Sequence, residues 1–317
     1  LSLLFVPPAK GGGMEIFMSL SFTSLASDTI FSEQLQAATG QIDYTLLNDY
    51  MFHIVLQNNE SVLRGLISSL LHLPPDEIQS IQIMNPVLPG ESISSKEFIL
   101  DIQIFLNNNT YLNLELQIEN EGNWPDRSLS YLCRSFDQLY HGQPYETALP
   151  TIHIGILDYD LFPESPAFYT KNMIMDTITH KVFNDKFVLS VLCLTQRNLA
   201  TEEDRLWQID TWAELFKAKT WEDIKMIAQT NHTLTNAAES LFQYNSDDII
   251  RQRCRAREDY ERHERTVNKK IQDLTQALEE SENARIETER TLTETEHSYQ
   301  QRIAELEAQL QAHGIQL

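Results

Sequence analysis

Every second residue is apolar in two short segments near the middle of the chain, 99–106 and 111–118, and most of the polar residues lie between them. In the first segment, Asp101 and Gln103 lie on the face opposite the apolar residues at 100, 102, 104 and 106. In the second, Glu115 and Gln117 lie opposite the apolar residues at 112, 114, 116 and 118. A period of two is typical of β-strands. The four polar residues between the segments are too few for a crossover, so we expect an antiparallel pair.

The two predicted strands bring acidic side chains together. If both apolar faces join one core, Asp101 lies on the same face as Glu115 and Gln117, opposite one of them, with Cβ atoms roughly 4.5–5.5 Å apart. Carboxylates this close repel each other unless a cation neutralises them. Their hard oxygen atoms suit Mg²⁺ or Mn²⁺, so Asp101 and Glu115 are candidate metal ligands. The competing interpretation is a half-exposed sheet with both acids in water, which is the commoner case for two acids considered alone.

Helical periodicity flanks these strands. A helix is predicted to begin after an N-cap at Asn48 and to place His53 on its surface. A second helix spans 61–73 and ends at Pro74-Pro75, because proline cannot continue the hydrogen-bond ladder. A third spans 127–140, with Leu129 among its inward residues, and the pattern from 201 onward is again helical.

Four further strands complete the predicted core. The apolar pattern places them at 78–84, 151–157, 168–179 and 187–194, with the last two joined by a turn at Asn184-Asp185. Helices, then strands, then helices predict an α/β fold with a mixed central sheet flanked by helices.

The last part of the chain, 251–317, differs from the rest. It is almost free of Gly and Pro, and four apolar residues hold the spacing of a coiled-coil seam: Val267, Ile271, Leu274 and Leu278. Leu292, Tyr299 and Leu306 continue the register, but polar residues fill the seam positions between them. The pattern fits a solvated long helix as well as a weak dimeric coiled coil, and both interpretations stay open.

Basic residues gather where this tail begins. Arg251 and Arg255 share one helix face, and Arg253 and Arg257 share another, so these arginines are candidates for gripping a DNA backbone. Arg127 is a further candidate DNA contact. Pairing with neighbouring glutamates on a solvated helix is the alternative for the tail cluster.

Composition limits the partners of the protein. The 317 residues carry 24 Lys and Arg against 46 Asp and Glu, a formal net charge of −22. Residues 1–250 account for −19 of this charge and 251–317 for −3, so broad affinity for phosphate backbones is not expected. A nuclease remains compatible with this charge, because divalent ions neutralise both the site and the substrate.

Compartment and chain start are inferred from further features. Three distant cysteines exclude a disulfide framework and fit the reducing cytoplasm. No apolar run reaches the ~20 residues that cross a bilayer, so no membrane contact is expected. The run Lys10-Gly11-Gly12-Gly13 before Met14 resembles a translated ribosome-binding site. We therefore interpret 1–40 as an N-terminal extension whose residues 1–13 are not translated.

The motifs together resemble a known family. Asp101, then Glu115-x-Gln117 on the next strand, is similar to the PD-(D/E)XK nuclease core in the form found in the bacterial Rpn family of recombination-promoting, transposase-like nucleases. Asn48-Asp49-Tyr50-Met51-Phe52, Arg127-x3-Tyr131, and Gly142-x2-Tyr145 with its following Leu149-Pro150 resemble other family segments. Leu100 replaces the usual proline before Asp101, and Gln117 replaces the usual lysine.

The resemblance implies a restriction-endonuclease-like core over 41–200, a helical region over 201–250 and a long charged helix over 251–317. It further implies a Mg²⁺-dependent (or Mn²⁺-dependent) DNA endonuclease linked to recombination or mobile elements. Asp101 and Glu115 would be the metal ligands, Gln117 would orient the attacking water and Asp49 would be an outer acid. The alternative function is a catalytically degenerate nuclease fold that assembles partners through its tail. The expected partners are DNA and, through the tail, a second copy in a weak homodimer.

Overall fold

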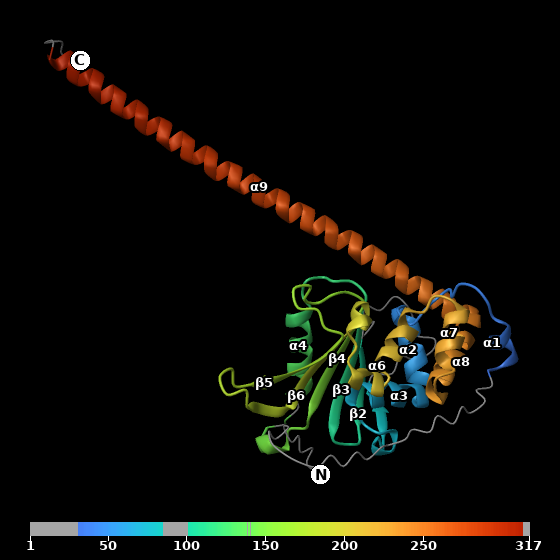
Figure 1. The fold of residues 1–317 in the computed structure, drawn as a ribbon. Helices are drawn as coiled ribbons and strands as arrows, with labels where there is room; N and C mark the ends of the chain where they lie inside the picture. Colours follow the sequence, from blue (N-terminus) through green and yellow to red (C-terminus); the bar gives the residue numbers. More distant parts are fainter. Residues whose placement is uncertain (1–30, 85–100, 138, 140, 313–317) are drawn as a thin grey trace.

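A mixed six-stranded sheet forms the centre of the protein (Figure 1). The computed structural model describes residues 31–84, 101–137, 139 and 141–312. Its strands are β1 (Ile81–Ile83), β2 (Asp101–Leu106), β3 (Thr110–Gln117), β4 (Thr151–Leu157), β5 (Tyr169–Met175) and β6 (Val182–Cys193). The strand order is β1-β2-β3-β4-β6-β5, and the β3–β4 and β4–β6 pairs are parallel while the others are antiparallel. The predicted α/β class with a mixed sheet is confirmed.

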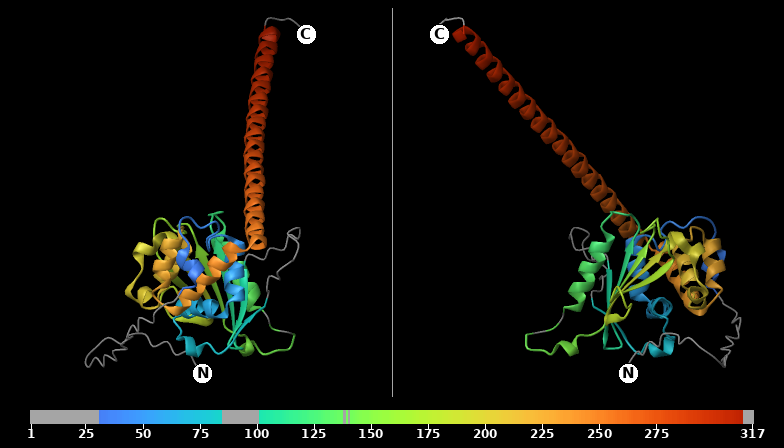
Figure 2. Two further views of the ribbon diagram at one scale, coloured as in Figure 1. Left: turned by 90° about the vertical axis from the view of Figure 1, so that its right-hand side faces the viewer. Right: turned by 60° about the vertical axis from the view of Figure 1, so that its left-hand side comes forward.

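Helices cover both faces of this sheet. The α-helices are α1 (Glu33–Ala37), α2 (Asp49–Asn58), α3 (Glu60–Leu71), α4 (Trp124–Phe136), α5 (Glu202–Leu206), α6 (Ile209–Lys217), α7 (Trp221–Ala228), α8 (His232–Ser246) and α9 (Asp248–Ala312). Short 3-10 helices are η1 (Pro75–Glu77), η2 (Tyr145–Thr147) and η3 (Leu194–Leu199). Helix α4 covers one face, and α2, α3 and α6 lie on the other with α7 and α8 behind them (Figures 1 and 2). The main apolar core fills the space on the α2 side, and a small cluster around Trp124 lies under α4.

The register between β2 and β3 places Asp101 opposite Glu115. Leu112, Leu114 and Leu116 point into the main core. Successive side chains of a strand alternate between its faces, so Glu115 points the other way, toward α4. The predicted antiparallel pairing, with residue 101 opposite residue 115, is therefore confirmed.

The predicted start of α2 is also confirmed. The Asn48 side chain caps the helix, with its Oδ1 accepting from the backbone N–H of Met51 at 3.1 Å. This cap satisfies one of the four N–H groups that every helix start leaves unpaired. It also fixes Asp49 in the first turn, next to the core.

The connection between β5 and β6 differs from the prediction. The turn lies around Asp176, whose carboxylate accepts from the backbone N–H groups of Ile178 and Thr179. Asn184 instead lies within β6, at a bulge where the pairing register shifts. An aspartate that bonds the backbone two and three residues ahead makes a local turn, and it outweighs the Asn-Asp signal further along.

Helix α4 starts earlier and ends earlier than predicted, and Leu129 is 49% exposed instead of inward. Trp124, Ser128 and Leu132 form its buried stripe at a spacing of four residues. Because the large indole of Trp124 anchors the helix, the inward face is rotated away from Leu129. The predicted strand over 78–84 is shorter too, and forms only β1.

Helix α9 belongs to two environments. Its first turns pack on α2 and α8, and Cys254 there is fully buried. Burial raises the pKa of the Cys254 thiol to about 12, so the thiol stays protonated. The helix then leaves the domain as a single rod (Figures 1 and 2). Its 65 residues span roughly 100 Å at about 1.5 Å per residue.

None of the helices in the described ranges combines the length and the apolar character needed to cross a bilayer. The N-terminal residues 1–30, which include the segment interpreted as untranslated, lie outside the described part of the chain.

Gly155 on β4 provides a test of the packing under α4. A Cβ atom at this position would lie 2.0 Å from Cζ2 of Trp124, so Gly155→Ala forces the helix or the ring to move. We expect a loss of about 1–3 kcal/mol in the free energy of unfolding, measured by urea titration. In a Trp124→Phe background the same substitution should cost less. An equal cost in both backgrounds would show that the indole is not the obstacle.

Candidate active site

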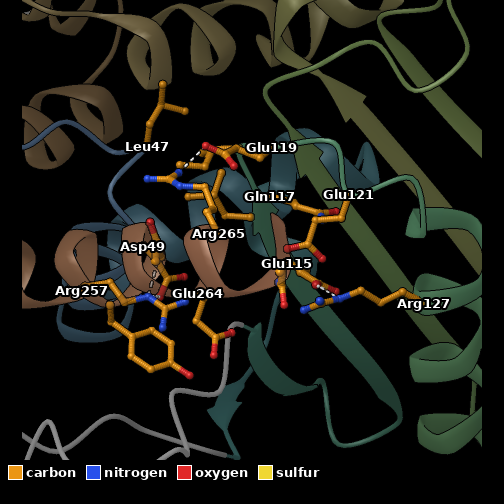
Figure 3. A pocket seen from close by; sticks show the side chains of 15 residues that line it. Leu47, Asp49, Glu115, Gln117, Glu119, Glu121, Arg127, Arg257, Glu264 and Arg265 are labelled. Atoms are coloured by element: carbon orange, nitrogen blue, oxygen red, sulfur yellow. Dashed lines mark hydrogen bonds and ion pairs between the residues drawn. The ribbon is translucent and has the colours of Figure 1, made fainter. Parts of the chain in front are cut away.

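A polar cavity opens at the carboxyl end of β3 (Figure 3). It has a volume of about 360 Å³ and lies between β3, the start of α2, the start of α4 and one side of α9. Its walls bring together Asp49, Glu115, Gln117 and Arg127, which come from three separate stretches of sequence. Helix α9 contributes Arg257, Tyr260, Glu261, Glu264, Arg265 and Asn268 to the opposite wall. Three of the residues predicted for the site therefore meet in one place, together with Arg127.

Glu115 is the most buried acid of this cavity, with 1% of its surface exposed. The Nε–H of Arg127 donates to its Oε1 at 2.9 Å. Nε2 of the buried His153 lies 3.4 Å from its other oxygen, Oε2, which has no hydrogen bond. The Arg127 guanidinium also lies over the ring of Tyr131, 5.5 Å from its centroid. A carboxylate so far from water is costly unless cations or donors face it, and α4 and β4 supply them.

Asp101 reaches this region through its backbone, which pairs with Glu115. Its side chain lies outside the described residues, so its role as a metal ligand stays a prediction. Among the described side chains, no group of three or more His, Cys, Asp or Glu residues is placed to hold a metal ion. The chemistry of the donors nevertheless fits a hard divalent cation, because Asp49 and Glu115 contribute carboxylate groups to the lining of one polar cavity.

Gln117 follows Glu115 by two residues, so both side chains lie on the same face of β3. Its Oε1 accepts from the hydroxyl of Tyr159 at 2.8 Å. Burial raises the pKa of the Tyr159 phenol, so this hydroxyl keeps its proton and continues to donate. Because the amide oxygen of Gln117 is engaged by Tyr159, its NH₂ group is available to donate to a water molecule.

Asp49 is held by the C-terminal helix. Nε of Arg257 lies 3.0 Å from Oδ2 of Asp49 and 2.9 Å from Oε1 of Glu261. On the other side, Nε2 of His53 lies 3.7 Å from Oδ1 of Asp49. Burial is the main cause that raises the pKa of Glu261.

Two sequence-based expectations change at this point. His53 is buried, not on the helix surface, because its ring packs beside Asp49 and Phe52. Arg257 is 5% exposed and paired with Asp49, so we leave it out of the proposed DNA-contacting set.

The other arginines at the start of α9 differ in exposure. Arg251 pairs with Asp248, and Arg253 donates to the Tyr50 hydroxyl at 3.4 Å and lies over its ring. Arg255 is exposed. Arg265, further along, pairs with Glu119 across the cavity mouth (Figure 3). Most of these charges are thus already matched by the protein itself.

Sequence reasoning missed His153, Tyr159 and the contact between Arg257 and Asp49. His153 and Tyr159 lie on and just after a strand that was predicted correctly. Alternation puts His153 on the same face as Gly155, which is the face toward α4. The alternation along this strand could therefore have indicated from the sequence that His153 faces α4. No local signal links Arg257 to Asp49, which lies about 200 residues away in the sequence.

A mixed sheet covered by helices, with an acid pair on two adjoining antiparallel strands, defines this protein as a restriction-endonuclease-like α/β fold. Comparison with family models gives a match over residues 46–296 to the PD-(D/E)XK nuclease family transposases. Because the match covers well over half of the sequence, the chain belongs to this family, and the resemblance to Rpn-type nucleases is confirmed. Comparisons with curated proteins and with solved structures returned no match.

The Arg257–Asp49 ion pair can be tested directly. Replacing Arg257 by Met leaves a buried carboxylate without its main cation, and we expect a loss of about 3 kcal/mol in the free energy of unfolding. Arg255→Met is the matched control, because Arg255 is exposed two residues away on the same helix; its cost should stay within about 0.5 kcal/mol. Equal effects of the two substitutions in urea unfolding would mean that the ion pair contributes nothing to stability.

Proposed function

We propose that this protein is a Mg²⁺-dependent DNA endonuclease that hydrolyses phosphodiester bonds during recombination or the movement of mobile elements. Family membership already links the chain to nuclease-type chemistry of mobile elements. The observation that carries the finer proposal is the backbone register that pairs Asp101 with Glu115, which itself lines a cavity together with Gln117, Asp49 and Arg127. Mn²⁺ would serve in place of Mg²⁺.

Asp101 and Glu115 would hold the metal ion. When bound, such an ion polarises a phosphoryl oxygen and lowers the pKa of an attacking water. The Gln117 amide would orient that water with its NH₂ group, because its Oε1 is engaged by Tyr159. Asp49 would act as an outer acid.

The positive charge usually supplied by lysine at the position of Gln117 would come from Arg127 here. Its guanidinium lines the cavity and already contacts Glu115. Unlike lysine, arginine stays charged at every relevant pH and bonds phosphate oxygens through two N–H groups. The exposed Arg255, with Arg251 and Arg253, would contact the DNA backbone further from the cut.

The proposed location of this activity is the cytoplasm. All three cysteines are free thiols, and Cys193 and Cys254 are buried in the fold. Free thiols fit a reducing compartment.

Plasmid cleavage tests the proposal. Supercoiled plasmid with the full-length protein and Mg²⁺ should be nicked or linearised, and chelation should stop the reaction. Asp101→Asn should lower the cleavage rate by at least two orders of magnitude, because it removes a charged ligand. Asp126→Asn, which changes an exposed acid on α4, should cleave normally.

An Asp101→Asn protein that cuts as fast as the wild type would contradict the proposed site. If the wild type itself never cuts, the second function applies: a degenerate nuclease fold that assembles partners through its tail. The exposed apolar stripe on α9 specifically favours a role in assembly, whether or not cleavage occurs.

That stripe supports the second part of the proposal, a weak homodimer through the tail. Its residues are all substantially exposed, from 39% for Val267 to 71% for Leu274: Val267, Ile271, Leu274, Leu278, Leu292, Tyr299 and Leu306. Residues 266–312 carry five Lys and Arg against ten Asp and Glu, so this rod is poorly suited to DNA. A second copy supplies a matching apolar seam of the same length. Polar residues such as Ser281 and Arg285 in the seam keep the association weak.

We expect half-association at tens of micromolar, on the order of −6 kcal/mol. Leu274→Lys combined with Leu278→Lys places charges in the seam and should give a monomer at every concentration tested by light scattering. Gln272→Lys combined with Gln276→Lys adds the same charges off the seam and should leave association unchanged. A wild-type protein that is monomeric at about 100 micromolar would rule out the dimer.

A further inference from the structure

A chain of buried polar side chains stands behind Glu115, away from the cavity. His153 on β4 is 1% exposed and Asn113 on β3 is 4% exposed. The parallel pairing of β3 with β4 sets these two residues side by side. Nδ2 of Asn113 lies 3.0 Å from Nδ1 of His153, and Nε2 of His153 lies 3.4 Å from Oε2 of Glu115. The order of contacts is thus Asn113, His153, Glu115.

The position of the ring proton follows from these neighbours. When the Asn113 amide donates to Nδ1, the proton of a neutral imidazole is on Nε2, the ring nitrogen that contacts the carboxylate. If the amide were flipped, its oxygen would face Nδ1, and the proton of a neutral ring would have to be on Nδ1. Nε2 would then present a lone pair to the carboxylate, and these two acceptors would repel each other. A doubly protonated ring also presents N–H to Glu115. Each stable arrangement therefore has a protonated Nε2 in contact with Oε2, at an ion-pair distance of 3.4 Å without hydrogen-bond geometry.

Aromatic rings prevent the imidazole from turning away. The ring of Trp124 lies 5.6 Å from it between centroids, and the ring of Tyr131 stacks at 6.2 Å with an interplanar angle of 4°. Gly155, the next residue on this face of β4, leaves the room that Trp124 occupies. His153 is therefore held in a dry environment, where the contact between its protonated Nε2 and the carboxylate contributes more than it would in water.

These contacts divide the two oxygens of Glu115 between two fixed partners. Arg127 takes Oε1 and His153 faces Oε2, so the carboxylate has one orientation. Neither His153 nor Asn113 lines the cavity, so neither reaches a substrate. Any effect of His153 on chemistry has to pass through Glu115.

We propose that His153, held by Asn113, is a positioning residue that fixes the Glu115 carboxylate in the orientation needed to bind a divalent metal ion. The inference rests on the proposed metal-dependent function and adds how the ligand is aimed. Partners behind a metal ligand commonly change metal affinity by about 10- to 100-fold when they are removed.

The test is Mn²⁺ binding by the full-length protein, measured by calorimetry without DNA. His153→Leu should raise the Kd for Mn²⁺ by about 10- to 100-fold. His153→Gln keeps an N–H donor of similar reach and should restore the Kd to within about three-fold of the wild type. His232→Leu on α8, an exposed histidine, should leave the Kd unchanged. Glu115→Gln should abolish binding and so identify the site.

Each outcome decides the matter. A Kd that is equal in the wild type and in a folded His153→Leu protein would overturn the positioning role while leaving the proposed function intact. If the Leu variant does not fold, His153→Asn replaces it, because the shorter amide cannot reach Glu115; an unchanged Kd there overturns the role as well. A wild type that binds no Mn²⁺ would contradict the proposed function and the inference together.

Discussion

The structure depends on how one buried negative charge is compensated. Glu115 lies on β3, which has β2 on one side and β4 on the other, and only 1% of its surface is exposed. An ionised carboxylate there is stable only with cations or donors around it. Arg127 from α4 and His153 from β4 fill that role, and Gly155 gives Trp124 the room to close the face. The position of α4 brings Arg127 to the Glu115 carboxylate, and the pairing of β3 with β4 brings His153 to it. The packing of Trp124 closes this face of the sheet.

Asp49 shows the same arrangement at the other side of the cavity, with an arginine and a histidine beside it. The difference is the origin of the arginine. Arg127 follows Glu115 by twelve residues, whereas Arg257 comes from the last helix. The nuclease core therefore includes the first turns of α9, where Cys254 and Arg257 are buried. A truncation before Cys254 would remove part of the core and one cation of the site, not only a tail.

Local patterns were sufficient for the part of the site built on neighbouring strands. Alternation alone placed Glu115 and Gln117 on one face, opposite the leucines, and the short loop predicted antiparallel pairing. The sequence left either residue as the partner of Asp101, and the structure pairs it with Glu115. The same reasoning failed where two local signals competed, as at Asp176 and Asn184, or where one large residue rotated a helix, as Trp124 does in α4. It could not find Arg257 beside Asp49, because contacts across 200 residues depend on the packing of α9 against α2.

Charge on α9 suggests how two copies would be arranged. With Ile271 and Leu278 at a positions of the seam, the flanking e positions include Glu282, Glu289 and Glu296, while the g positions facing them in a parallel pair are Ala277, Ala284 and Thr291. In an antiparallel pair, e positions face e positions, and glutamates would oppose glutamates. Parallel pairing avoids that repulsion, although Arg285 then meets its own copy in the seam. Because α9 leaves the domain at the rim of the cavity, parallel tails would keep both proposed active sites at the same end of the rod, where two strands of one duplex can be reached together.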